Sequence, residues 1–512
     1  MSGRRPRRSH RTWPQRLLIA TNVVLVVACL GSAAALSKLR STIDEVPVVD
    51  VGSSLTPTVE ATEPRNFLII GTDSAARIDP DDEIRKGREG GELADVIMIL
   101  RVDPRDGTAR LLSIPRDSRV AVAPDWRMAR INTAISGVNG PRNLVQTIKR
   151  NFGISIDNFV KVDFQAFRDL VEVLDGVAVY FTTPVRDRES GLYIDEAGCV
   201  TLDERQALAY ARARHYEYQV DGRWRTDISS DHGRIARQQD FIKRALRRAS
   251  DKGLRNPSTA MGVIDAVRGS LVLDDTLDVG TLLTLVSEFQ SFNPDSLDSQ
   301  QVPTEYAPRG GVAYEEIIWS AAEPMLEPFR GVEPGAPLSP RNVIVDVRGR
   351  DSIEDELAAH AASLDEVGFD AEFVRGGSLG YDTVIRYGPN GREAARLLAA
   401  HLEGTPEVEF DEELPGYRVV LSIGSDFAGV RAEPRPLEEL PADLLPDDDA
   451  GEGEAGEGPV DEGEGQDPDP DGGDPSGEEP GGTGEVTTTT TTTTTTIPGI
   501  APADSEAAAR CR

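Results

Sequence analysis

A short strand that ends in charged residues constrains the fold of this chain more than any other stretch. Leu111 to Ile114 holds three apolar residues in four positions, which predicts a buried strand. Pro115 ends the pairing of this strand, because its nitrogen has no hydrogen to donate. Arg116 and Asp117 then follow at the strand's end, where the sites of α/β domains usually lie. Arg116 offers a planar fork of donors that suits phosphate, although an Arg-Asp pair at this place also fits a surface ion pair.

Strands and helices alternate at short range on both sides of this stretch, which predicts an α/β sandwich with a central mixed sheet. This domain is expected over residues 65–330. The expected strands are 66–71, 93–102, 109–114, 159–164 and 176–181. The expected helices are 141–152, with proline at a plausible first position, 167–174, 203–212 and 231–250.

A second, smaller α/β unit is expected over residues 341–432, after a linker at 331–340 that is rich in Gly and Pro. Its expected strands are 342–347, 371–374, 382–387 and 417–423, and its expected helices are 353–368 and 391–402. The size of about 90 residues lies within the usual range for a domain.

The N-terminus carries a membrane signal. Residues 17–37 contain no charged side chain, and this length is sufficient for one transmembrane helix. Six arginines and no acidic residue occur in residues 1–16, so this segment should stay cytoplasmic and the bulk of the chain extracellular. We therefore expect a single-pass protein of the cell membrane. A cleaved signal peptide is the alternative, since Ala33 to Ala35 resembles a cleavage site.

Two further segments lack a globular pattern. Residues 38–64 are predicted to be a linker. Residues 433–512 are predicted to be a disordered tail, because they are acidic, rich in Gly and Pro, and contain ten consecutive threonines at 487–496. We interpret the tail as a solvated spacer, with an O-glycosylated stalk as the alternative. The formal net charge of −32 argues against a nucleic-acid partner.

The cysteines and histidines exclude some classes of site. The three cysteines are Cys29, Cys199 and Cys511, and their spacing suggests neither a disulfide framework nor a zinc site. The five histidines do not occur in the H-x-x-H spacing typical of zinc enzymes.

Two aspartates follow or begin neighbouring strands. Asp73 comes after the first strand of the main domain, and Asp95 begins the second. One or two carboxylates with phosphate oxygens and water are the ligands that Mg²⁺ prefers, so these residues are a candidate magnesium site. The alternative is a pair of aspartates that make turns or helix caps.

Arginines gather in a later part of the main domain. Arg212 and Arg214 lie two positions apart, and Arg234 and Gln238 lie four apart on one helical face. Asp231 stands where a helix N-cap belongs, which gives it a purely structural alternative role. Solvated surface arginines are the general alternative, but such a concentration in an acidic protein favours a phosphate clamp.

These motifs resemble, in order, those of the LytR-CpsA-Psr (LCP) family of envelope glycopolymer transferases. The motif segments are 66–74, 93–100, 113–118, 130–134, 159–167, 207–214 and 231–239. The unit at 341–432 resembles the LytR C-terminal domain, and the whole organisation looks like an actinobacterial member.

The resemblance implies an LCP fold and a reaction. A glycan with one phosphate passes from a polyprenyl-pyrophosphate carrier to a peptidoglycan hydroxyl, at a membrane. It also implies that Asp73 and Asp95 hold Mg²⁺ and act in catalysis with Arg116. The residues implied to bind or order the pyrophosphate are Arg116, Arg212, Arg214, Arg234, Gln238 and Asp231.

The chain departs from the family pattern in four ways. Leu93 stands where the family usually has an arginine, and Val96 where it usually has a threonine. Arg77 follows the first aspartate at four positions instead of two, and residues 79–91 form a charged insertion. A non-catalytic protein that binds polyprenyl phosphate or peptidoglycan, and a polyprenyl-pyrophosphate pyrophosphatase, are the alternatives to the transferase.

Overall fold

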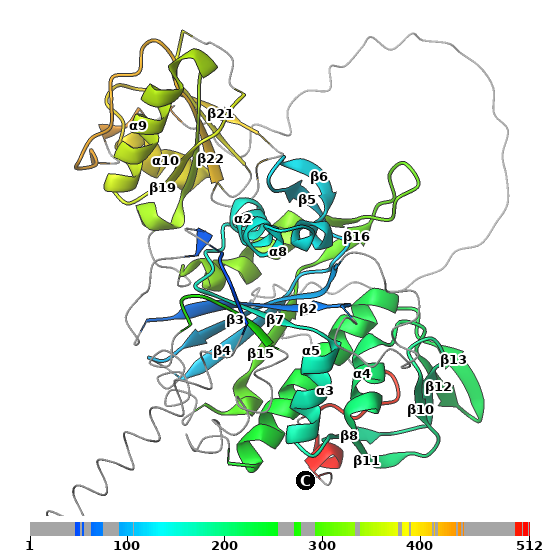
Figure 1. Cartoon of the computed structure of the whole chain (residues 1–512). Coiled ribbons are helices and arrows are strands. Elements are labelled where there is room, and N and C mark those ends of the chain that lie inside the picture. Colours follow the sequence, from blue (N-terminus) through cyan, green and yellow to red (C-terminus); the bar gives the residue numbers. More distant parts are fainter. Residues whose placement is uncertain are drawn as a thin grey trace, which may run out of the picture.

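The computed structural model shows two α/β units and a C-terminal segment that returns to the first of them (Figure 1). The predicted cytoplasmic segment, the transmembrane helix at 17–37 and most of the acidic tail lie outside the described residues. In the part of the chain that is described, no helix combines the length and apolar character needed to cross a bilayer. The described residues are 47–51, 54–55, 63–74, 92–105, 107–253, 271–277, 292–332, 338–376, 381–388, 391–411, 414, 418–436, 439–441, 444, 497–503, 505–509 and 511.

The centre of the first unit is a mixed sheet of seven strands in the order β1-β14-β7-β2-β3-β4-β15. Strand β2 lies in the middle, parallel to β7 and antiparallel to β3. Its sequence, RNFLIIGT, is buried at most positions, as expected of a strand covered on both faces. The strands are β1 Val48–Val49, β2 Arg65–Thr72, β3 Ala94–Asp103, β4 Thr108–Ser113, β7 Asn158–Val162, β14 Leu271–Asp274 and β15 Asp298–Gln301.

Helices cover both faces of this sheet (Figure 1). On one face, α2 (Gly140–Phe152) and α8 (Trp319–Leu326) pack against the even-numbered side chains of β2, such as Leu68 and Ile70. As predicted, α2 has proline in its first turn, and it ends at Gly153, whose φ of 68° suits glycine. The other face is covered by α3 (Phe164–Val173), α4 (Glu204–Arg212) and α5 (Ser230–Asp251).

Smaller sheets extend the first unit beyond these helices. Strand β8 pairs with β11, and a four-stranded sheet has the order β10-β9-β12-β13. Two further hairpins are β5-β6 and β16-β17. The strands are β5 Arg119–Val122, β6 Arg127–Arg130, β8 Val177–Phe181, β9 Val185–Asp187, β10 Leu192–Ile194, β11 Gly198–Leu202, β12 Glu217–Val220, β13 Arg223–Thr226, β16 Thr304–Tyr306 and β17 Glu315–Ile317.

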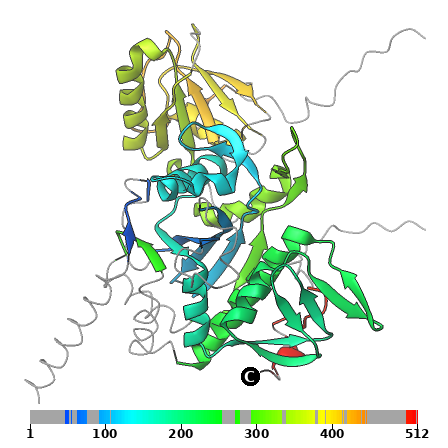
Figure 2. The ribbon, with the colours of Figure 1, turned by 45° about the vertical axis from the view of Figure 1, so that its right-hand side comes forward.

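The second unit is a five-stranded sheet of order β19-β18-β22-β20-β21 with its own buried core (Figure 2). Asp346, which is 2% exposed, pairs with Arg418 of its own unit at 2.7 Å and joins the first unit through Arg150 of α2 at 3.1 Å. The elements are β18 Ile344–Arg348, α9 Glu354–Glu366, β19 Asp370–Phe373, β20 Val384–Tyr387, α10 Arg392–Ala400, β21 Glu407–Phe410 and β22 Arg418–Ser422. The expected helices and strands here are confirmed, and β21 is additional.

The end of the chain corrects the prediction for residues 433–512. The C-terminal strap, which we define as residues 497–503, 505–509 and 511, packs on the first unit (Figure 2). Ile500 forms an antiparallel bridge with Phe181, and Cys511 forms a disulfide with Cys199, with 5.4 Å between their Cα atoms. The apolar side chains of the strap, such as Ile497 and Ile500, are buried against the first unit. The spacing of the cysteines did not predict this disulfide.

Two other boundaries differ from the prediction. Residues 48–49, inside the predicted linker, form β1 and pair with β14 at the edge of the sheet. The helix expected from residue 167 begins at Phe164, because the Asp163 side chain caps it by accepting a hydrogen bond from the Ala166 amide.

Candidate active site

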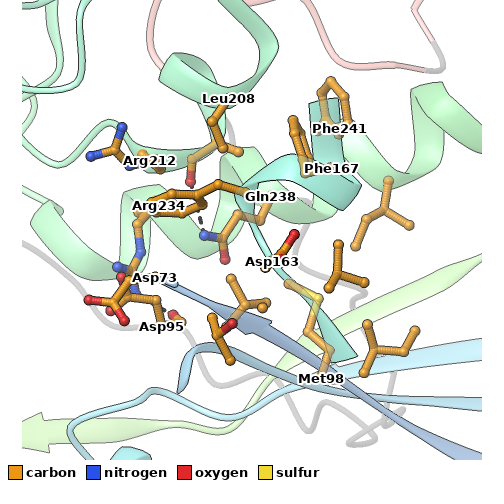
Figure 3. A pocket seen from close by; sticks show the side chains of 18 of the residues that line it. Asp73, Asp95, Met98, Asp163, Phe167, Leu208, Arg212, Arg234, Gln238 and Phe241 are labelled. Atoms are coloured by element: carbon orange, nitrogen blue, oxygen red, sulfur yellow. Dashed lines mark hydrogen bonds between the residues drawn. The ribbon is translucent and has the colours of Figure 1, made fainter. Parts of the chain in front are cut away.

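A cavity of about 660 Å³ lies between the central sheet and helices α3, α4 and α5. Alternation along β3 produces its floor: Ile97 and Ile99 enter the core under α2, whereas Val96, Met98 and Leu100 face the cavity. The helices supply a second apolar wall, in which Figure 3 shows Phe167, Leu208 and Phe241. Further apolar lining comes from Ile69, Leu111, Val162, Phe164, Leu170, Leu174, Ile242, Ala245, Leu246 and Ala249. Such a space suits a flexible hydrocarbon chain.

One end of the cavity is charged. The structure brings together there most of the side chains that the sequence singled out. They come from strand ends β2 and β3, from the loop after β4, and from α4, α5 and the segment between them. The predicted site residues that line the cavity are Asp73, Asp95, Arg116, Arg212, Arg214, Arg234 and Gln238. Asp231 is not part of the lining, but it contacts three of these arginines.

Asp95 accepts hydrogen bonds from two arginines. Its Oδ1 contacts Arg116 Nη1, and it lies 3.4 Å from Arg214 Nη2. Burial alone would raise the pKa of Asp95, but Arg116, Arg234 and Arg214 outweigh it and lower this pKa. The Asp95 carboxylate is therefore held in its charged form.

Asp231 connects the arginines to one another. Its carboxylate lies 3.1 Å from Arg234 Nη2, 3.4 Å from Arg214 Nε and 3.9 Å from Arg116 Nε. The N-cap of α5 is Ser229, so Asp231 lies inside the first turn and the capping alternative was wrong. One carboxylate thus orients guanidinium groups from three separate segments of the chain.

Two of the guanidinium groups at the charged end have a hydrogen-bond donor without an acceptor. The Nε atoms of Arg116 and Arg234 are buried and, within the described residues, have no hydrogen-bond partner. Burial lowers the pKa of Arg234 to about 10. Burial opposes the charge of Arg116 too, but Asp95, Asp117 and Asp231 raise its pKa. Buried donors without an acceptor are costly, so this end of the cavity fits an anion with several oxygens.

Helix α5 also fixes the backbone on both sides of Arg212. Gln238 Nε2 donates to the Ala211 carbonyl at 2.9 Å, and Arg237 Nη2 donates to the Ala213 carbonyl at 2.6 Å (Figure 3 shows the first). The guanidinium of Arg212 lies 4.9 Å from the centre of the Phe164 ring. Gln238 therefore holds the backbone beside the arginines, a contact that its spacing from Arg234 did not predict.

Sequence reasoning named Asp117 as an ion-pair partner of Arg116 and missed Arg237 as a supporting residue. Arg237 is fully buried and pairs with Asp227 at 3.2 Å. Asp117 lies between Arg116, at 3.5 Å, and Arg130, at 3.4 Å. Arg237 lies three positions after Arg234, a spacing that puts both on one side of α5 and could have indicated it.

Asp73 and Asp95 both line the charged end of the cavity (Figure 3), and they follow Thr72 and Ala94, which pair between β2 and β3. The Asp73 carboxylate accepts a hydrogen bond from the Leu93 amide at 3.2 Å, so the backbone of Leu93 orients it. Among the residues that the structure describes, no group of three or more His, Cys, Asp or Glu side chains is arranged to hold a metal. Two carboxylates fit Mg²⁺ when phosphate and water supply the other oxygen ligands.

The departures from the family pattern fall partly on this site. Leu93 and Val96 both line the cavity and add to its apolar surface. Arg77 and the insertion at 79–91 lie outside the described residues.

Comparison with known proteins gives a consistent result. Residues 28–327 match the LytR_cpsA_psr family. The probable cell wall biosynthesis protein LcpB of Corynebacterium glutamicum is 31% identical over 258 residues, which cover 49% of this chain but only 56% of the relative. The polyisoprenyl-teichoic acid–peptidoglycan teichoic acid transferase TagU of Oceanobacillus iheyensis is 27% identical over 300 residues, covering 56% of this chain and 84% of the relative.

A solved structure, the LytR-Csp2A-Psr enzyme from Actinomyces oris, is 24% identical, with a TM-score of 0.44. The match covers 56% of this chain and 97% of that one. The fold and site themselves define a mixed α/β protein whose apolar cavity ends in a cluster of arginines and aspartates. The chain belongs to the LytR_cpsA_psr family, since the family pattern matches more than half of its length. The resemblance of its motifs to this family is confirmed.

Proposed function

We propose that this protein transfers a glycan with one phosphate from a polyprenyl-pyrophosphate carrier to a peptidoglycan hydroxyl. One observation carries the proposal: an apolar cavity of about 660 Å³ ends in arginines with buried, unsatisfied donors. A polyprenyl pyrophosphate has the same two parts, a hydrocarbon chain and a polyanionic end. The names of relatives such as TagU, a teichoic acid transferase, support the same reaction class.

The transfer replaces one bond of the pyrophosphate. The acceptor oxygen attacks the phosphorus that carries the glycan, the bridging P–O bond breaks, and polyprenyl phosphate leaves. Arg116, Arg214 and Arg234 would bind the phosphate oxygens and stabilise the charge that shifts to the leaving group. Arg212, at the same end of the cavity, would add a fourth cation, and Gln238 would support it through the backbone.

The hydroxyl proton requires an acceptor. Asp73 and Asp95 both line this end of the cavity. Asp95 is a poor base, because its neighbouring arginines hold its pKa below the ordinary value. Asp73 is therefore the carboxylate to which we assign the proton.

Mg²⁺ is the proposed cofactor, held by Asp73 and Asp95. Bound there, the ion would neutralise charge on the pyrophosphate oxygens. The charged end contains four arginines, balanced by Asp73, Asp95, Asp117 and Asp231, so a polyanion benefits from an additional cation. Removal of divalent ions with a chelator should abolish transfer, and Mg²⁺ should restore it.

The remaining organisation is proposed from the sequence. Residues 17–37 would anchor the protein in the cell membrane, with residues 1–16 in the cytoplasm and both α/β units outside. The lipid carrier would then enter the cavity from the same membrane. The second unit would be a LytR C-terminal domain that serves in binding, and the acidic segment before the strap would be a disordered spacer.

The test is a transfer assay with the full-length protein in detergent. A short polyprenyl-pyrophosphate glycan, peptidoglycan fragments and Mg²⁺ are incubated with the wild type, Arg116→Ala and Asp73→Ala. The exposed Arg225→Ala serves as a control. Glycan on peptidoglycan that requires Arg116 and Asp73 but not Arg225 supports the proposal. Phosphate release without transfer would indicate a pyrophosphatase, and lipid binding without turnover a non-catalytic binding protein.

A further inference from the structure

The sheet of order β10-β9-β12-β13 has two different faces. Arg186 pairs with Tyr193 on β10 and with Glu217 on β12, and Trp224 on β13 pairs with Gln219. Residues directly opposite one another share a face, and so do residues two apart on a strand. Tyr193, Arg186, Glu217, Gln219 and Trp224 therefore lie on one face of the sheet, which we call the outer face.

The opposite face is buried where β9 and β10 pack against the C-terminal strap. It carries Val185, Leu192 and Ile194, which are all buried in one cluster with Ile497 and Ile500 of the C-terminal strap. The strap thus supports the sheet from behind. The outer face is solvent-accessible in part, with Tyr193 51% exposed, and Figure 1 shows the sheet at the margin of the molecule.

The outer face combines aromatic rings with planar polar groups. The Arg186 guanidinium lies 4.0 Å from the centre of the Trp224 ring, and its Nε donates to Glu217 Oε2 at 2.6 Å. Sugar rings bind to surfaces of this kind, because their C–H faces pack on aromatic rings while their hydroxyls exchange hydrogen bonds with guanidinium, carboxylate and amide groups. We propose that the outer face binds the glycan strand of the peptidoglycan acceptor.

The sheet adjoins the candidate active site. Asp187, at the end of β9, and Glu189 and Ser190 after it line the cavity. The Asp187 carboxylate accepts hydrogen bonds from the amides of Glu189, Ser190 and His215, the last at 2.8 Å. His215 follows Arg214, so the sheet and the arginines are fixed to each other. The sheet that would bind the glycan is thus attached to the segment that carries the arginines of the cavity. This inference rests on the proposed function.

Charge favours a sugar over an anionic membrane surface as the occupant. On the outer face the charge of Arg186 is matched by that of Glu217. The exposed cations of β13, Arg223 and Arg225, pair with Val220 and Tyr218, so they belong to the opposite face from Trp224. An interfacial anchor needs aromatic rings and unpaired cations on the same side, which this sheet does not provide.

The experiment measures binding of peptide-free glycan strands of alternating N-acetylglucosamine and N-acetylmuramic acid to the full-length protein in detergent. Trp224→Ala and Tyr193→Ala are compared with Arg225→Ala, which changes the same sheet on its other face. We expect Trp224→Ala to weaken binding about tenfold, since an aromatic ring loses its stacking contact. Trp224→Phe should retain most of the binding, and this variant guards against a folding defect in Trp224→Ala. Arg225→Ala should bind like the wild type.

Equal glycan affinity in all variants would overturn the inference. It would also be overturned if Trp224→Ala lost attachment to phosphatidylglycerol vesicles while glycan binding stayed constant, because the sheet would then face the membrane. Release of polyprenyl phosphate with water as acceptor is measured in parallel, and Trp224→Ala should keep it. Weakened glycan binding in Trp224→Ala with no turnover in the wild type would contradict the proposed function and leave the glycan site standing. If Trp224→Ala bound glycan and carried out transfer like the wild type, the glycan site would be contradicted and the proposed function would stand.

Discussion

Asp231→Asn tests whether one carboxylate organises the arginines of the site. The change removes a negative charge and keeps the size of the side chain. Arg234 and Arg214 lose an ionic partner at 3.1 and 3.4 Å, and Arg234 is only 3% exposed. Breaking a fully buried ion pair costs about 3–5 kcal/mol. Because the Asp231 side chain is 23% exposed, water will replace part of the interaction, and we expect the free energy of unfolding to fall by about 1–3 kcal/mol.

The same change separates binding of the donor from turnover. The site gains net positive charge, so affinity for the polyprenyl-pyrophosphate donor should be unchanged or higher. The three guanidinium groups lose their common acceptor, and a small displacement of positioning groups typically lowers turnover about 10- to 100-fold. The measurement is kcat and the donor KM in the transfer assay, with Asp355→Asn as a control, because Asp355 is exposed on α9 of the second unit.

Two results would refute this reasoning. Wild-type turnover in Asp231→Asn would mean that the arginines keep their positions without the carboxylate. A rise in donor KM with unchanged kcat would mean that Asp231 contributes only to ground-state binding.

Four further predictions concern stability and the cavity. Cys511→Ser should lower the free energy of unfolding by about 2–5 kcal/mol, and a reductant should lower the melting temperature of the wild type but not of the variant. Asp346→Ala should cost about 3–5 kcal/mol in urea unfolding, because it leaves Arg418 buried without its carboxylate; an unchanged midpoint would show that the contact between the units contributes little. Burial would raise the pKa of Asp95, but the arginines lower it overall, so its stabilisation is present above about pH 4 and is lost as the pH falls through the folded pKa. Asp95→Asn should therefore flatten the acid limb of a melting-temperature profile, and a parallel limb in both proteins would contradict this. Ala245→Trp should fill the cavity and weaken binding of long polyprenyl chains more than of short ones; equal losses for both lengths would argue against a chain that extends along α5.

Elements with a strong local signal could be predicted from the sequence. Strand β2 contains the apolar run Phe67 to Ile70, and α2 has a proline at its start and a glycine at its end. Short strands of mixed polarity, such as β12 (EYQV) and β13 (RWRT), carry no such signal, because what defines them is pairing with one another and with β9. The same is true of β1, which has only two residues.

The sequence indicated most residues of the candidate site, but it did not indicate which of them contact one another. The sequence motifs identified Asp95, Arg116 and Asp231 separately. The contact of Arg116 with both Asp95 and Asp231 depends on the packing of α5 against the sheet. The disulfide between Cys199 and Cys511 spans 312 positions, and local spacing holds no information about such a pair. Apolar residues at 497 and 500, after a long acidic stretch, are the one signal that could have indicated the docked strap.

The central claim is that the arginine end of the apolar cavity binds the pyrophosphate of a prenyl lipid. The most direct measurement is calorimetric titration of the full-length protein in detergent with geranylgeranyl pyrophosphate, with geranylgeraniol as the uncharged comparison, for the wild type and Arg116→Ala. We predict that the wild type binds the pyrophosphate much more tightly than the alcohol, and that Arg116→Ala loses most of this difference. Equal affinity for the two lipids, or an unchanged preference in Arg116→Ala, would contradict the account.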